Sequence, residues 1–208
     1  MSNITLIVAP HMDDEVLSAA SFLEKNLTSV VIFYHTNKHA LIKDDSLQKE
    51  NDNLIDYLGC IREYSSLDYN DLLDTIPIVN VINEYENLLK KYSPHTIVLP
   101  NPSYNQDHRV VYEAALTALR PHDRIPFVKR VLIYEEPETF GTLRKVESFR
   151  PIYFRPVDIA RKLELISIYK TQIRGHRGFE NITAIASVRG MQCNEKYAEA
   201  FEIARWVE

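Results

Sequence analysis

Two short stretches of the sequence gather side chains that could bind a metal ion. The first, "HMDDE" (11–15), carries one imidazole and three carboxylates, and the second, "NQDHR" (105–109), carries an imidazole next to a carboxylate. An imidazole and a carboxylate from the first stretch, with the imidazole of the second, would make a His-Asp-His set. Such a set suits Zn²⁺ and leaves a fourth coordination position for water. The sequence therefore offers two halves of a candidate metal site.

Each stretch has a simpler explanation when it is taken alone. Acidic residues at a helix start commonly cap the helix or complement its dipole, and Asp13 or Asp14 would do this well. Asp107 could cap the following helix in the same way. A single histidine after a strand is more often solvated or hydrogen bonded than a metal ligand. The metal-site hypothesis therefore requires that the fold bring the two stretches together.

Strand-like and helix-like segments alternate along the chain. Strands are expected at 3–10, 29–35, 61–66, 94–100 and 128–137. Helices are expected at 14–26, 45–58, 75–92, 107–119, 156–172 and 181–192. Residues 141–155 look irregular or extended, and residues 198–206 fit either a helix or a strand. This alternation favours a single α/β domain over residues 1–208, with a Rossmann-like, mostly parallel sheet covered by helices on both faces.

The expected fold singles out two loops. Ligands of such sheets bind beyond the carboxyl ends of the strands. Loops 9–15 and 101–108 each follow a predicted strand, and they contain the two metal-binding stretches. Asp107 could orient the imidazole of His108, and Arg109 could fix its loop or contact a substrate.

Overall composition excludes some functions. The formal net charge of -5 argues against a partner such as nucleic acid, which needs a basic face. Cys60 and Cys193 have no metal-ligand spacing, and reduced thiols are the simplest expectation. Because no signal-peptide pattern and no apolar run of about 20 residues occur, we expect a cytoplasmic protein without a membrane span.

The two stretches resemble the motifs of a known family, the PIG-L/LmbE-like N-deacetylases. "PHMDDE" (10–15) is similar to the family motif A-H-P-D-D-E, and "NQDHR" (105–109) to its motif H-x-D-H-R. Near the C-terminus, "YKTQ" (169–172) and "VRG…YAEAFEIAR" (188–205) resemble a subgroup associated with surface-polysaccharide biosynthesis. The resemblance implies that His11, Asp14 and His108 bind Zn²⁺, for which Fe²⁺ or Co²⁺ could substitute.

The same resemblance implies roles in catalysis. Asp13 would be the general base that takes a proton from the attacking water. Asn105 stands where the family motif has histidine; it can donate a hydrogen bond to an oxyanion but cannot carry a proton. The basic segment "IRGHRGF" (173–179) is a weaker candidate. Its His176, with Arg174 and Arg177, could close over a substrate or form a solvated turn.

The function implied is hydrolysis of an N-acetyl or other N-acyl group from an amino-sugar-containing substrate. The substrate would be of the N-acetylglucosamine type, a small molecule or a glycan precursor of surface-polysaccharide or glycoconjugate biosynthesis. Relatives often form homo-oligomers, so this chain could do so too. Two alternatives remain open: an amidase that cleaves another C–N bond, such as one in a thiol conjugate, and a non-catalytic carbohydrate-binding protein on the same scaffold.

Overall fold

The computed structural model describes residues 4–23, 29–34, 45–67, 72–137 and 149–208. Its strands are β1 Thr5–Ala9, β2 Ser29–Phe33, β3 Ile61–Tyr64, β4 Thr96–Pro100, β5 Arg130–Tyr134, β6 Tyr153–Pro156 and β7 Ala198–Trp206. Its α-helices are α1 Asp14–Ser18, α2 Asp45–Leu58, α3 Ile78–Tyr92, α4 Gln106–Ala118, α5 Ile159–Ile168 and α6 Phe179–Cys193. Four short 3₁₀ segments are η1 Ala20–Phe22, η2 Leu73–Thr75, η4 Lys170–Gln172 and η5 Gly175–Arg177.

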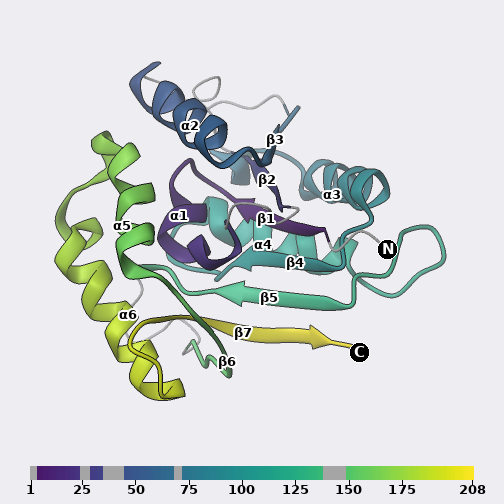
Figure 1. Cartoon of the computed structure of the whole chain (residues 1–208). Helices are drawn as coiled ribbons and strands as arrows, with labels where there is room; N and C mark the ends of the chain where they lie inside the picture. Colours follow the sequence, from purple (N-terminus) through teal and green to yellow (C-terminus); the bar gives the residue numbers. More distant parts are fainter. Residues whose placement is uncertain (1–3, 24–28, 35–44, 68–71, 138–148) are drawn as a thin grey trace.

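The strands form one seven-stranded sheet in the order β3-β2-β1-β4-β5-β7-β6 (Figure 1). The first five strands in this order are parallel, and β7 is antiparallel to both β5 and β6. The expected α/β architecture with a mostly parallel sheet is therefore confirmed. Residues 198–206, for which the sequence left two alternatives, form the long strand β7.

Apolar side chains on both faces of the central strands hold the helices in place. Along β1, Leu6 and Val8 lie in one buried cluster and Ile7 and Ala9 in the other, because successive side chains of a strand point to opposite faces. Helices α3 and α4 contribute to the first cluster, and α1, α2, α5 and α6 to the second. Such two-sided burial is typical of parallel sheets. Among the described helices, none combines the length and the hydropathy needed to cross a bilayer.

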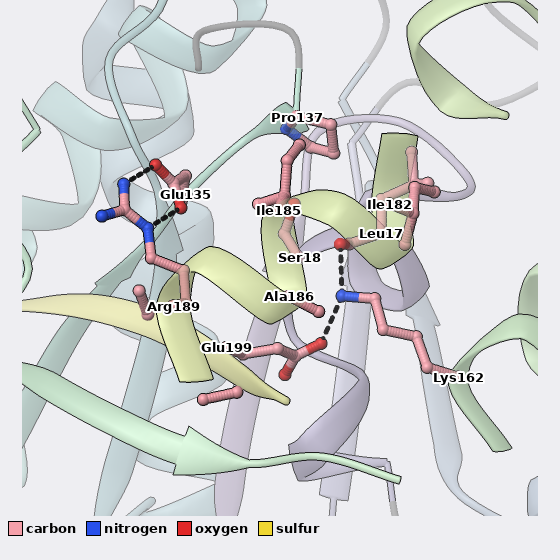
Figure 2. Close-up of a pocket in the computed structure, with 12 residues that line it drawn as sticks. Leu17, Ser18, Glu135, Pro137, Lys162, Ile182, Ile185, Ala186, Arg189 and Glu199 are labelled. Atoms are coloured by element: carbon pink, nitrogen blue, oxygen red, sulfur yellow. Dashed lines mark hydrogen bonds and ion pairs between the residues drawn. The ribbon is translucent and has the colours of Figure 1, made fainter. Parts of the chain in front are cut away.

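The helix expected at 14–26 is shorter than predicted. Helix α1 ends at Ser18, and the chain continues as η1; residues 24–28 lie outside the described part. At the break, the backbone N–H groups of Ala20 and Ser21 donate to the carboxylate of Glu199 over 3.0 and 2.9 Å. Lys162 donates to the carbonyl of Leu17 over 2.8 Å and to Glu199 over 2.6 Å (Figure 2). The buried ion pair of Lys162 and Glu199 thus provides hydrogen-bond partners for backbone groups at the end of the helix.

This ion pair is expected to be important for stability. Both side chains are about 5% exposed, so Lys162→Met would leave the charge of Glu199 buried without its partner. We expect a loss of about 3–5 kcal/mol in the free energy of unfolding, measured by urea denaturation. Lys170→Met, at an exposed position, is the matched control and should change stability by less than about 0.5 kcal/mol. Equal stability of the two variants would contradict the role given to the pair.

Other boundaries also differ from the sequence predictions. The helix expected at 75–92 begins at Ile78, after a separate 3₁₀ turn, and Pro77 occupies its N-cap position. The segment expected as one helix at 156–172 is divided into the end of β6, helix α5 and η4. Asp158 caps α5 by accepting from two backbone N–H groups. Of the irregular or extended segment 141–155, residues 141–148 lie outside the described part.

Candidate active site

The fold brings the two candidate metal-binding stretches together at the carboxyl edge of the sheet. Strands β1 and β4 are hydrogen-bonded neighbours, so the loops that follow them meet. His11 Nδ1 lies 3.1 Å from His108 Nε2 and 3.4 Å from Asp14 Oδ2, and His108 Nε2 lies 3.3 Å from Asp14 Oδ2. Among the described residues, these three form the group that could hold a metal ion.

The triangle of donor atoms fits a zinc ion. Tetrahedral ligands at about 2.0–2.1 Å from Zn²⁺ lie about 3.3 Å from one another. The three observed separations, 3.1 to 3.4 Å, match one face of such a tetrahedron. Two imidazole nitrogens and one carboxylate oxygen are also a donor set that zinc accepts readily. The residues present therefore fit the ion.

Each imidazole has a carboxylate on its second nitrogen. His11 Nε2 lies 3.2 Å from Asp107 Oδ2, and His108 Nδ1 lies 2.5 Å from Glu136 Oε1. The prediction that Asp107 orients His108 was wrong, because consecutive residues of helix α4 do not face each other. Asp107 instead reaches across to His11, and its Oδ1 accepts from the backbone N–H of Leu73 over 2.9 Å. Such contacts fix which imidazole nitrogen faces a metal.

Glu136 was missed in the sequence analysis. It follows β5, the strand next to β4, and is 4% exposed. The signal was present: the rule that ligands bind beyond strand ends applies equally to "YEEP" (134–137), which follows β5. Its neighbour Glu135 accepts hydrogen bonds from Nε and Nη2 of Arg189 on α6 (Figure 2).

Buried carboxylates make this cluster favourable for a cation. Burial acts to lower the pKa of His11, but Asp107 and Asp14 together outweigh it and raise the pKa to about 9. Burial likewise opposes protonation of His108, yet Asp14 and Glu136 raise its pKa well above the usual value. Burial alone would raise the pKa of Asp14, but the two imidazoles hold it well below its usual value. A metal ion would displace protons from these imidazoles on binding.

Glu136→Gln is expected to weaken metal binding by about 10–100-fold, because it removes the charge that orients His108. The measurement is a competition titration of Zn²⁺ against a chromophoric chelator. Glu113→Gln is the matched control, since it neutralises an exposed acid of helix α4. An equal loss of affinity in both variants would show a general charge effect and contradict the orienting role.

Asp13 lies beside the triangle in an unusual backbone conformation. Its φ of 122° is in a region that non-glycine residues rarely adopt, at a cost of about 1–3 kcal/mol, and such strain clusters at active sites. Asp13 occupies the N-cap position of α1, but its side chain makes no capping hydrogen bond there. Oδ2 accepts from Arg177 Nη1 over 2.5 Å, and Oδ1 is buried without a hydrogen-bond partner in the described part of the chain. One carboxylate oxygen is thus left available to accept a proton.

Burial raises the pKa of the Asp13 carboxyl well above its usual range, and the negative charge of Asp14 adds to this, while Arg177 opposes it. A raised pKa suits a group that must both take and return a proton. The carboxylate of Glu15 stabilises the strained backbone at Asp13. It accepts from the backbone N–H of Asp13 over 3.1 Å and from the hydroxyl of Tyr169 over 2.7 Å. Burial raises the pKa of Glu15 to about 7.

The remaining candidates have different contacts. Asn105 is the N-cap of α4, and its Oδ1 accepts from the backbone N–H of Asp107, so Asp107 is not the cap. The amide nitrogen of Asn105 is therefore the group that could donate to a substrate. Arg109 donates to the carbonyls of Ser103 and Tyr104, which agrees with a role in fixing the loop. His176 is exposed on η5, and the residue of this basic segment that reaches the site is Arg177.

The chain is thus an α/β protein that places a His-Asp-His cluster and a neighbouring acid at the carboxyl edge of its sheet. The chain belongs to the PIG-L family, described as GlcNAc-PI de-N-acetylase, which matches residues 6–119. No curated protein is significantly similar to the sequence.

Solved structures share the fold over nearly the whole chain. N,N'-diacetylchitobiose deacetylase from Pyrococcus horikoshii is 18% identical, with a TM-score of 0.75 over 97% of this chain and 83% of its own. GalB, a 4-carboxy-2-hydroxymuconate hydratase from Pseudomonas putida KT2440, is 20% identical, with a TM-score of 0.75 over 99% and 98%. The zinc-inhibited form of teicoplanin deacetylase Orf2 is 16% identical, with a TM-score of 0.70 over 97% and 98%.

Proposed function

We propose that this protein is a metal-dependent hydrolase that removes an N-acetyl or other N-acyl group from an amino-sugar-containing substrate. The observation that carries this proposal is the zinc-sized triangle of His11, Asp14 and His108. Beside it lies Asp13, whose Oδ1 has no hydrogen-bond partner among the described residues. Membership of the PIG-L family and the fold shared with proteins named as deacetylases support the same reaction.

The residues can be given roles in this hydrolysis. When held by His11, Asp14 and His108, Zn²⁺ supplies Lewis acidity toward the amide carbonyl and lowers the pKa of water. Asp13 Oδ1 takes one proton from the attacking water as its oxygen bonds to the carbonyl carbon. The amide nitrogen of Asn105 donates to the oxyanion. Asp13 then returns the proton to the leaving nitrogen, and the C–N bond breaks to give an amine and a carboxylic acid, which loses its proton to solvent.

The fold alone does not select this reaction. GalB is named as a hydratase and matches this chain as well as the chitobiose deacetylase does. The family description favours deacylation over hydration. Cleavage of a thiol conjugate would use the same groups, so it remains the nearest alternative. A non-catalytic sugar-binding role is less well supported, because the ligand triangle and Asp13 are both present. The cytoplasmic location and the homo-oligomer remain predictions.

A substrate panel tests the proposal. The zinc-loaded protein is incubated with N-acetylglucosamine, N,N'-diacetylchitobiose, UDP-N-acetylglucosamine and an N-acetylcysteinyl glucosamine conjugate, and free amine and acetate are quantified. Equal release of acetate and amine from one of the sugars is the expected result. Release from the thiol conjugate alone would establish the nearest alternative. No release from any compound by fully metal-loaded protein would contradict the proposal.

A further inference from the structure

An arginine from the C-terminal part of the chain holds the candidate catalytic base. Arg177 Nη1 lies 2.5 Å from Asp13 Oδ2, although the two residues are 164 positions apart in the sequence. The side chains are only 15% and 2% exposed, so the pair is largely removed from water. Arg177 also lies beyond residues 6–119, the part of the chain that the family match covers.

The local structure fixes Arg177 in this position. It ends the tight turn η5, in which Gly175 has a φ of 49° and its carbonyl accepts from Gly178 N over 3.0 Å. The amide of Asn181, in helix α6, donates to the same carbonyl over 3.0 Å. The guanidinium of Arg177 makes a second contact of 3.3 Å with Gln172 Oε1. The turn therefore holds the backbone of Arg177, and the contacts with Asp13 and Gln172 hold its guanidinium.

The contact makes the two oxygens of Asp13 unequal. Oδ2 is occupied by the guanidinium, and Oδ1 is the buried oxygen without a partner among the described residues. Rotation of the carboxylate would exchange the two oxygens, and the ion pair opposes that rotation. We infer that Arg177 is a positioning residue, which holds Asp13 by Oδ2 so that Oδ1 is presented for proton transfer. This inference rests on the proposed function, because it takes Asp13 as the base.

Kinetics of Arg177 variants distinguish positioning from simple structural support. Using the panel sugar that the wild type hydrolyses, Arg177→Met should lower kcat by about 10²-fold, with KM and zinc content unchanged. Guanidinium ion added to Arg177→Ala should restore part of the lost turnover. Arg174→Met, at an exposed position of the same segment, is the matched control and should behave as wild type. A rise in KM alone, or an unchanged kcat, would overturn the inference.

A second measurement is independent of any substrate. Arg177→Met is made in the wild type and in an Asp13→Ala background, and Tm is determined for all four proteins. If the pair forms, Arg177→Met lowers Tm by about 5 °C or more in the wild type and has little effect in the Asp13→Ala background. An equal decrease in both backgrounds would mean that Arg177 acts through other contacts, and the inference would fail. A failure of the substrate panel, by contrast, would count against the proposed function alone.

Discussion

An Asp13→Asn variant is expected to keep its zinc and to lose turnover by about 10²–10⁴-fold. Asparagine has the same shape, and its carbonyl oxygen can still accept from Arg177. It cannot take a proton from water, so the proposed base is removed while the surroundings remain. Asp13 also lies outside the triangle formed by His11, Asp14 and His108, so zinc content should not change.

The measurement for this variant combines zinc analysis with kcat on the panel sugar that the wild type hydrolyses. Asp123→Asn, a neutralised acid at an exposed position, is the control for the loss of one negative charge. Two results would oppose the assignment in different ways. Loss of zinc would place Asp13 among the metal ligands, and full activity would remove it from the mechanism.

Asp14→Ala is expected to weaken zinc binding by more than 100-fold. Loss of a group that only orients a ligand costs about 10–100-fold, and Asp14 would itself be a ligand. Its Oδ2 also accepts from the backbone N–H of His11 over 2.8 Å, so alanine would loosen that loop as well. Asp14→Asn separates the two effects, because the amide oxygen can keep the backbone contact but carries no charge.

Both Asp14 variants are titrated with Zn²⁺ in competition with a chelator, and circular dichroism confirms that they are folded. We expect His11→Ala and His108→Ala to lose zinc to a similar extent. A folded Asp14→Ala protein that binds zinc as tightly as the wild type would show that the metal, if any, is held elsewhere.

The sequence was sufficient to locate the two halves of the candidate site. The stretches 11–15 and 105–109 follow strands, and the carboxyl ends of parallel strands share one edge of the sheet. Because β1 and β4 are direct neighbours, His11 and His108 meet as this rule implies. The helix at 45–58 was also predicted with its observed bounds, because its helical spacing is followed by Gly59, which adopts the positive φ typical of a residue that ends a helix.

Contacts between distant segments could not be predicted from spacing. Arg177 contacts Asp13, and Glu199 accepts from the backbone just after helix α1, through tertiary contacts that no local motif encodes. Asp107 was assigned to its sequence neighbour His108 because adjacency along the chain was taken for adjacency in space. In a helix, neighbouring side chains diverge, and Asp107 contacts His11 instead.

Metal reconstitution tests the central claim most directly. The protein is stripped of metal with a chelator, Zn²⁺ is returned in steps, and bound zinc and acetate released from the panel sugars are measured together. We expect acetate release to rise in proportion to bound zinc, up to one ion per chain, and Asp13→Asn to bind the same zinc without releasing acetate. Acetate release that persists in the stripped protein, or that is absent at full zinc occupancy, would contradict metal-dependent N-deacylation at this site.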